Sequence, residues 1–254
     1  MGNSESTPQE EESCAANQPY NPKLVGTVKK DYKRHLILCS GQMDWTGKPE
    51  KESGTFINSL TKELKSRNLP DGEPGTLFTL CSEPNRSDKG VDIIVYPEGV
   101  YSNEEVLSEK GVRYFQVTEA DLPSFVDHIL KDEAPPNIHK EKVTWEHVVL
   151  VCTHGTRDKR CGRIGPQVVD QLTGMLSERN ISSDKVAILG SSHLGGHKYA
   201  AVVVVYPEGD WYGQMTAKNA SDLMDAYLQC KSLYPPGFRG KMGESIQQSK
   251  ERVK

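Results

Sequence analysis

Short apolar runs alternate along this chain with longer stretches in which apolar positions follow helical spacing. Val91-Asp-Ile-Ile-Val-Tyr96 is a compact apolar run that ends at Pro97-Glu-Gly99, as expected of a buried strand. Residues 53–67 instead place Phe56, Ile57 and Leu60 on one helical face. The pattern predicts an α/β protein. Its expected strands are 35–39, 76–81, 91–96, 148–151, one just before His193, 200–205 and a short 211–214. Its expected helices are 53–67, 121–130, a segment after residue 161, and 217–229.

The same order of elements recurs in the second half. His35-Leu-Ile-Leu is matched 112 positions later by His147-Val-Val-Leu, and residues 56–69 match 168–181 at the same offset. Val95-Tyr-Pro-Glu-Gly99 recurs as Val205-Tyr-Pro-Glu-Gly209. Self-similarity of this kind indicates two copies of one supersecondary unit.

We expect two tandem thioredoxin-like modules, because about five elements per 100 residues around a central sheet suit that fold. A flavodoxin-like sheet would need more strictly alternating crossovers. The expected division is a disordered acidic tail over 1–30, a first module over 31–133, a proline-containing linker over 134–143, a second module over 144–235, and a loosely held C-terminal tail over 236–254.

Charge and composition exclude several classes of protein. The net charge of −4 comes from four glutamates within residues 1–22, and the remainder is balanced, so no nucleic-acid surface is indicated. No apolar run approaches the length of about 18 residues that suggests a membrane helix. Six scattered cysteines and no secretory signal favour a reducing compartment, and we expect the cytosol. Met1-Gly2 with Ser6 fits a myristoylation pattern, by chance or as a weak membrane anchor.

Four metal-ligand side chains follow two strands of the second module. Cys152 and Cys161 lie in Cys152-Thr-His-Gly-Thr-Arg-Asp-Lys-Arg-Cys161-Gly, directly after an apolar strand. His193 and His197 bracket Leu-Gly-Gly, also after a strand. Gly195 and Gly196 would let the backbone bend and approach a prosthetic group. We predict that the four side chains converge on one metal centre.

The first module lacks all four residues. Ser40 stands where the second module has Cys152, and Glu83-Pro84 stands where it has histidines. Cys39 and Cys81 lie inside apolar strands, where we expect small buried side chains. The metal-ligand residues therefore distinguish the second copy from the first.

Spacing tests limit the chemistry. A phosphatase loop is excluded, because its Cys and Arg are separated by one residue more than Cys152 and Arg157 are. A Rieske centre is excluded because the sequence lacks the second motif that it requires, Cys-x-x-His. A thioredoxin-type dithiol would leave both histidines without a role. A zinc site has the right ligands but lacks the usual Cys spacing of about two to four residues, so a two-iron centre fits better. A zinc- or cluster-stabilised interaction protein and a thiol oxidoreductase using Cys152 and Cys161 stay open.

The motifs together resemble those of the sucrase/ferredoxin-like family. They are the stretch from Cys152 to Cys161, His193-Leu-Gly-Gly-His-Lys-Tyr-Ala200, Asp210-Trp-Tyr-Gly213, and Phe238-Arg-Gly-Lys-Met-Gly243, which has Phe in place of the family's Trp. The resemblance covers about residues 33–243. It implies a [2Fe-2S] cluster in a C-terminal thioredoxin-like ferredoxin domain, held by Cys152, Cys161, His193 and His197, and a cluster-free N-terminal copy.

The implied function is one-electron transfer, coupled to protons through the histidines, by a carrier rather than an enzyme with its own substrate. The implied partners are an electron-donating reductase, with a flavoprotein as one candidate, and an acceptor that the sequence does not name. Arg157, Arg160 and Lys198 are candidate cations near the centre, and His154 is a candidate outer partner rather than a ligand. The sequence contains no paired carboxylates that would support sugar hydrolysis.

Overall fold

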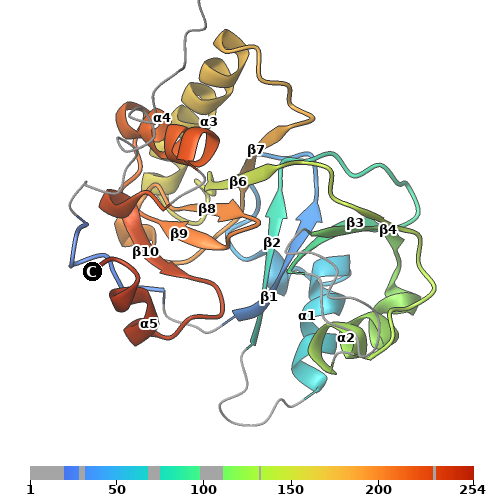
Figure 1. The fold of residues 1–254 in the computed structure, drawn as a ribbon. Helices are drawn as coiled ribbons and strands as arrows, with labels where there is room; N and C mark the ends of the chain where they lie inside the picture. The colour runs from blue at the N-terminus through green and yellow to red at the C-terminus, as the bar shows by residue number, and fades with distance from the viewer. Residues whose placement is uncertain (1–19, 29–31, 68–74, 98–110, 132, 231–232) are drawn as a thin grey trace, which may run out of the picture.

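The strands form one continuous sheet in a computed structural model of the chain. The structure describes residues 20–28, 32–67, 75–97, 111–131, 133–230 and 233–254. Within them the sheet has ten strands, in the order β10-β9-β8-β6-β7-β2-β1-β3-β4-β5 (Figure 1). Residues 1–19 of the predicted tail, which include its myristoylation pattern, lie outside the described residues.

The N-terminal module is a parallel β-α-β unit followed by an antiparallel β-β-α unit. Its strand order is β2-β1-β3-β4, with β1 parallel to β2 and antiparallel to β3. This is the order expected of a thioredoxin-like sheet. The elements are β1 (Tyr32–Cys39), η2 (Pro49–Lys51), α1 (Phe56–Ser66), β2 (Gly75–Cys81), β3 (Val91–Tyr96), β4 (Val112–Val117), η3 (Glu119–Asp121) and α2 (Leu122–Lys131).

The C-terminal module repeats this arrangement, as the sequence repeat predicted. Its strand order is β7-β6-β8-β9, again with one parallel pair at β6 and β7. The fold prediction of two thioredoxin-like modules is confirmed. The elements are β6 (His147–Cys152), α3 (Lys159–Glu178), β7 (Val186–Ser191), η4 (His197–Tyr199), β8 (Val203–Tyr206), β9 (Asp210–Tyr212), α4 (Ala217–Asp225), η5 (Ala226–Cys230), η6 (Pro235–Gly237), β10 (Phe238–Lys241) and α5 (Ile246–Glu251).

The two modules join where β2 and β7 meet as antiparallel neighbours. Ser82 donates its backbone N–H to the Gly190 carbonyl at 2.9 Å, and Ser192 donates its own to the Leu80 carbonyl at 2.9 Å. The hydroxyl oxygens of the same two serines accept the N–H groups of Gly190 and Leu80. The junction is therefore closed by a nearly symmetric set of hydrogen bonds.

The half-sheets pack against each other on the faces that their helices leave free. Alternate residues of each strand point to opposite faces, so Leu36 and Leu38 pack on α1 and α2 whereas Ile37 joins a core shared with the second module. Across this shared core the repeat-related Tyr96 and Tyr206 stack with ring centroids 4.4 Å apart. The helix pairs consequently lie on opposite outer sides of the molecule (Figure 1).

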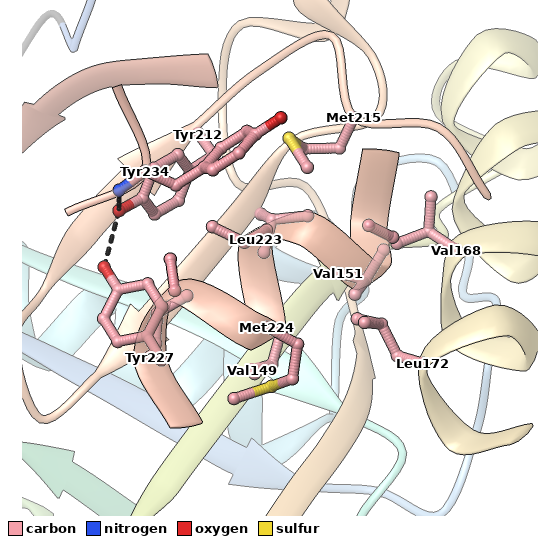
Figure 2. Packing of buried hydrophobic residues seen from close by; sticks show 14 of the residues in the cluster. Val149, Val151, Val168, Leu172, Tyr212, Met215, Leu223, Met224, Tyr227 and Tyr234 are labelled. Carbon is pink, nitrogen blue, oxygen red and sulfur yellow. Dashed lines mark hydrogen bonds between the residues drawn. The ribbon is translucent and has the colours of Figure 1, made fainter. Parts of the chain in front are cut away.

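The helix-side core of the C-terminal module holds β6 against α3. Val149 and Val151 of β6 share a buried cluster with Val168 and Leu172 of α3 (Figure 2). Asp158 starts α3 as its N-cap by accepting the N–H of Arg160. The strand and helix that carry Cys152 and Cys161 are thereby fixed relative to each other.

Two tails expected to be disordered or loosely held are ordered where the structure describes them, contrary to the prediction. Leu24 is only 1% exposed, which anchors residues 20–28 within the predicted acidic tail. The linker contributes a strand, β5 (Lys140–Lys142), whose backbone pairs with β4 while its side chains stay exposed. The C-terminal tail adds β10 to the sheet, where Phe238 is fully buried.

In the part of the chain that the structure describes, no helix combines the length and apolarity required for a membrane crossing.

Candidate metal centre

Cys152 and Cys161 come together because α3 approaches the end of β6 very closely. Cys152 is the last residue of β6, and Cys161 lies in the first turn of α3. A Cβ atom on Gly165 would overlap the carbonyl oxygen of Cys152 and lie 3.1 Å from Cα of Thr153. Both cysteines are about 1% exposed and neither forms a disulfide. The glycine in α3 thus allows the two thiols to meet.

The thiol of Cys152 is stabilised as a thiolate. Its pKa is lowered well below the usual value, first by a hydrogen bond with the Cys161 thiol and next by one with the His193 side chain. The backbone N–H groups of Leu194 and His154 also donate to this sulfur, against the opposing effect of burial. The pKa of Cys161 is raised, mainly by the same hydrogen bond. Several donors therefore point at one sulfur atom between the two loops.

The histidine loop places His193 against Cys152 and His197 at the surface. The rings of His193 and His197 have centroids 5.5 Å apart, and His197 Nδ1 lies 3.9 Å from Asp158 Oδ2. The His197 side chain is 47% exposed. The structure thus brings three of the four predicted ligands into contact and sets the fourth beside them. Among the described residues, no three His, Cys, Asp or Glu side chains surround a single point for one metal ion.

Both glycines of the loop are required by its backbone. Gly195 and Gly196 have φ angles of +85° and +74°, which lie in the left-handed region that glycine adopts without strain. A Cβ atom on Gly196 would also overlap the guanidinium of Arg239. The sequence prediction that these glycines shape the loop agrees with this geometry.

Arg239 holds the histidine loop, a role that the sequence argument did not identify. Its guanidinium donates to the carbonyl of Gly195 at 3.3 Å and to the carbonyl and hydroxyl oxygens of Thr27 at 3.0 Å each. It lies 5.0 Å from the ring centroid of Tyr199. Burial lowers the pKa of Arg239 to about 10, so it stays charged at neutral pH. The Arg-Gly motif that contains it was the available signal.

The N-terminal module covers the cysteine loop with residues 43–50. Thr153 donates its hydroxyl to the Met43 carbonyl at 2.6 Å, and Thr156 donates its backbone N–H and hydroxyl to the Asp44 carboxylate. His154 is 1% exposed, with Nε2 2.9 Å from the Thr46 carbonyl oxygen and no hydrogen-bond partner at Nδ1. The N-terminal module therefore shapes the loop that carries the cysteines.

The other basic residues singled out from the sequence have partners away from the cysteines. Arg157 donates to the Gly47 carbonyl at 2.8 Å and lies 3.7 Å from Glu50. Arg160 pairs with Asp158 at 2.8 Å. Lys198 lies over the ring of Tyr199. Arg160 is nevertheless linked to two predicted ligands, because its charge acts on Cys161 and its partner Asp158 lies 3.9 Å from His197 Nδ1.

The equivalent place in the N-terminal module is filled by structural contacts. Ser40 donates its hydroxyl to the Cys81 carbonyl at 2.7 Å and accepts the indole N–H of Trp45 at 2.9 Å. Cys39 and Cys81 are buried, as expected, and face each other across β1 and β2. The pKa of Cys39 is raised by its hydrogen bond with Cys81 and by burial, so Cys39 does not resemble a reactive thiol.

Comparison with known proteins gives one family. The chain matches the sucrase/ferredoxin-like family over residues 24–240. A protein named "Altered inheritance of mitochondria protein 32" from Clavispora lusitaniae is 32% identical over 219 residues, covering 76% of this chain and 74% of that protein. Its namesake from Meyerozyma guilliermondii is 24% identical, covering 87% and 84%. "Actin patches distal protein 1" of Saccharomyces cerevisiae is 26% identical, covering 74% and 66%.

Solved structures give a weaker likeness. A thioredoxin-like [2Fe-2S] ferredoxin from Aquifex aeolicus aligns with 38% of this chain and 93% of its own, at 19% identity and a TM-score of 0.35. A likeness of this size carries no conclusion about the site.

Proposed function

Because the chain belongs to the sucrase/ferredoxin-like family, we propose that it is a one-electron carrier with a [2Fe-2S] cluster held by Cys152, Cys161, His193 and His197. The observation that carries the proposal is the contact of Cys152 with both Cys161 and His193 at the ends of β6 and β7. The N-terminal module has Ser40 in place of Cys152 and Glu83-Pro84 in place of the histidine loop. Two thiols and two imidazoles are a donor set suited to such a cluster.

The protein side chains would set the properties of the centre. The cluster supplies one-electron chemistry, and two neutral imidazoles in place of thiolates raise its potential above that of an all-cysteine ferredoxin. The N–H groups of His154 and Leu194 donate to the Cys152 sulfur and so favour extra negative charge there. An imidazole ligand, unlike a thiolate, has a second ring nitrogen that can exchange a proton with solvent, and the His197 side chain is 47% exposed.

The partners follow from this function. An electron carrier requires a reductase that supplies the electron, for which a flavoprotein is one candidate, and an acceptor. The cysteines are buried and His197 is exposed, so the electron would enter and leave on the His197 side. The cytosolic location stays a prediction.

Ligand substitutions test the proposal. His197→Cys should keep the cluster, lower its reduction potential because a thiolate replaces a neutral ligand, and weaken the pH dependence of that potential between about pH 6 and 9. His139→Cys is the matched control, since His139 is 68% exposed in the segment preceding β5. The measurement is a spectroelectrochemical titration of each purified protein. If His197→Cys and His139→Cys share the wild-type potential and pH profile, His197 is not a ligand.

A thiol oxidoreductase is the second candidate, because the thiols of Cys152 and Cys161 are in contact and the pKa of Cys152 is lowered. Their exposure of about 1% argues against it, since a disulfide substrate must reach the attacking sulfur. Disulfide reduction that persists in a His193→Ala, His197→Ala double variant and stops in Cys152→Ser would favour this candidate. A zinc-stabilised interaction protein would instead contain zinc and no sulfide.

A further inference from the structure

Basic side chains surround the exposed edge of the candidate centre. We call the set Arg157, Lys159, Arg160, Arg163 and Lys198 the basic rim; all five are exposed. His197 belongs to the same edge, because its ring lies 3.9 Å from Asp158, the residue that begins α3. The whole chain has a net charge of −4, so the charge at this edge has the opposite sign to that of the molecule.

Part of the basic rim has no acidic partner among the residues that the structure describes. Arg157 lies near Glu50, and Arg160 pairs with Asp158. In the part of the chain covered by the structure, Lys159, Arg163 and Lys198 form no ion pair. Asp44, another carboxylate near the cysteine loop, accepts hydrogen bonds from Thr156. The rim therefore keeps an excess of positive charge that faces solvent.

The start of α3 is not stabilised by the cations that stand there. The first turn of a helix is stabilised by acidic side chains and disfavours cations, yet α3 has no acidic residue in its first turn and begins Lys159-Arg160. Exposed cations at a position where they do not stabilise the helix suggest a role in binding another molecule. Their place beside His197 suggests that this molecule exchanges electrons with the centre.

We propose that the basic rim is the docking surface for the electron donor, and that the donor presents an acidic surface around its own redox group. This inference rests on the proposed function, because it takes His197 as the exposed edge of the electron-transfer centre. Opposite charges would steer the two proteins together and orient the donor toward His197. The centre that Cys152, Cys161, His193 and His197 would hold would take up the one electron that the donor loses.

Two proteins of opposite charge serve as probes. Flavodoxin hydroquinone, an acidic one-electron donor, should reduce the full-length cluster-containing protein at a rate that falls as salt rises from about 10 to about 300 mM. Ferricytochrome c, a basic acceptor, should oxidise the reduced protein at a rate that rises with salt. The variant Lys159→Glu, Arg163→Glu should slow the first reaction about tenfold at low salt and accelerate the second.

The matched control is Lys62→Glu, Lys65→Glu, which changes the charge equally on exposed positions of α1 in the other module. It should change either rate by less than about twofold. Wild-type visible spectra and potentials in both variants show that the centre itself is intact.

The outcomes separate the two proposals. A protein without iron and sulfide overturns the proposed function and this inference with it. An intact centre whose reaction with flavodoxin is insensitive to salt, or equally slow in both variants, overturns the inference alone. Salt-dependent binding to phosphatidylserine vesicles that is lost in Lys159→Glu, Arg163→Glu, with unchanged flavodoxin rates, would assign the rim to a membrane and also overturn it.

Discussion

Two glycines in the same helix give the sharpest test of how the cysteines are brought together. A Cβ atom on Gly165 would overlap the carbonyl oxygen of Cys152, whereas a Cβ atom on Gly174 would meet nothing within 4 Å. Both substitutions to alanine gain similar helix propensity, about 1 kcal/mol. Only Gly165→Ala forces α3 away from β6, because the neighbouring atoms are main chain and cannot rotate aside.

The expected difference follows from these two terms. Overpacking in a tight core costs about 1–3 kcal/mol, and contact with a strand carbonyl favours the upper end of this range. Gly174→Ala should therefore raise the free energy of unfolding by about 1 kcal/mol, while Gly165→Ala should lower it by about 2 kcal/mol after the same propensity gain. The displacement also moves Cys161 away from Cys152, so Gly165→Ala should bind less iron.

Urea unfolding of the metal-free full chain, followed by tryptophan fluorescence, measures the first effect, and iron per chain measures the second. Equal stability and equal iron content in the two variants would refute the close approach of α3 to β6 as the reason that the thiols meet.

Three further predictions address other contacts. Arg239→Met should lose about 3 kcal/mol of stability with its three hydrogen bonds and release bound iron faster to a chelator, whereas the exposed Arg179→Met should lose less than about 1 kcal/mol; equal losses would contradict the role of Arg239. Tyr206→Phe should cost about 1–2 kcal/mol in urea unfolding, because buried His35 Nδ1 loses its partner at 2.7 Å; no loss would count against that bond. Burial raises the pKa of Asp210 to about 6, so its folded form binds a proton more tightly than the unfolded chain and its contribution to stability falls as pH rises from about 4 to 6. Asp210→Asn should remove about 2–3 kcal/mol of that pH dependence, and a difference from wild type that is constant over this range would exclude the effect.

The repeat made most of the fold predictable. The order of strands and helices recurs between the two halves. Short apolar runs mark the strands, and apolar positions at helical spacing mark the helices. The sequence did not predict strand β4, because the charged residue Arg113 interrupts its apolar pattern. Arg113 can be buried there because it forms ion pairs with Asp92 and Glu83, which lie 20 or more positions away. Distant charge pairs of this kind leave no local signal.

The candidate site was predictable as far as its loops. Cys152 and His193 follow two parallel strands, whose carboxyl ends share one edge of the sheet, so their proximity could be expected. The cover formed by residues 43–50 could not, because it relies on the backbone carbonyls of Met43 and Thr46, which any sequence possesses. The role of Arg239 likewise depends on a strand that composition suggested was a tail.

The central claim is best tested by measuring iron and acid-labile sulfide in the full chain, isolated without oxygen, together with its visible spectrum. The account predicts a coloured protein with about two iron and two sulfide per chain, whose absorption bleaches on one-electron reduction. A colourless protein with one zinc per chain and no sulfide would contradict it.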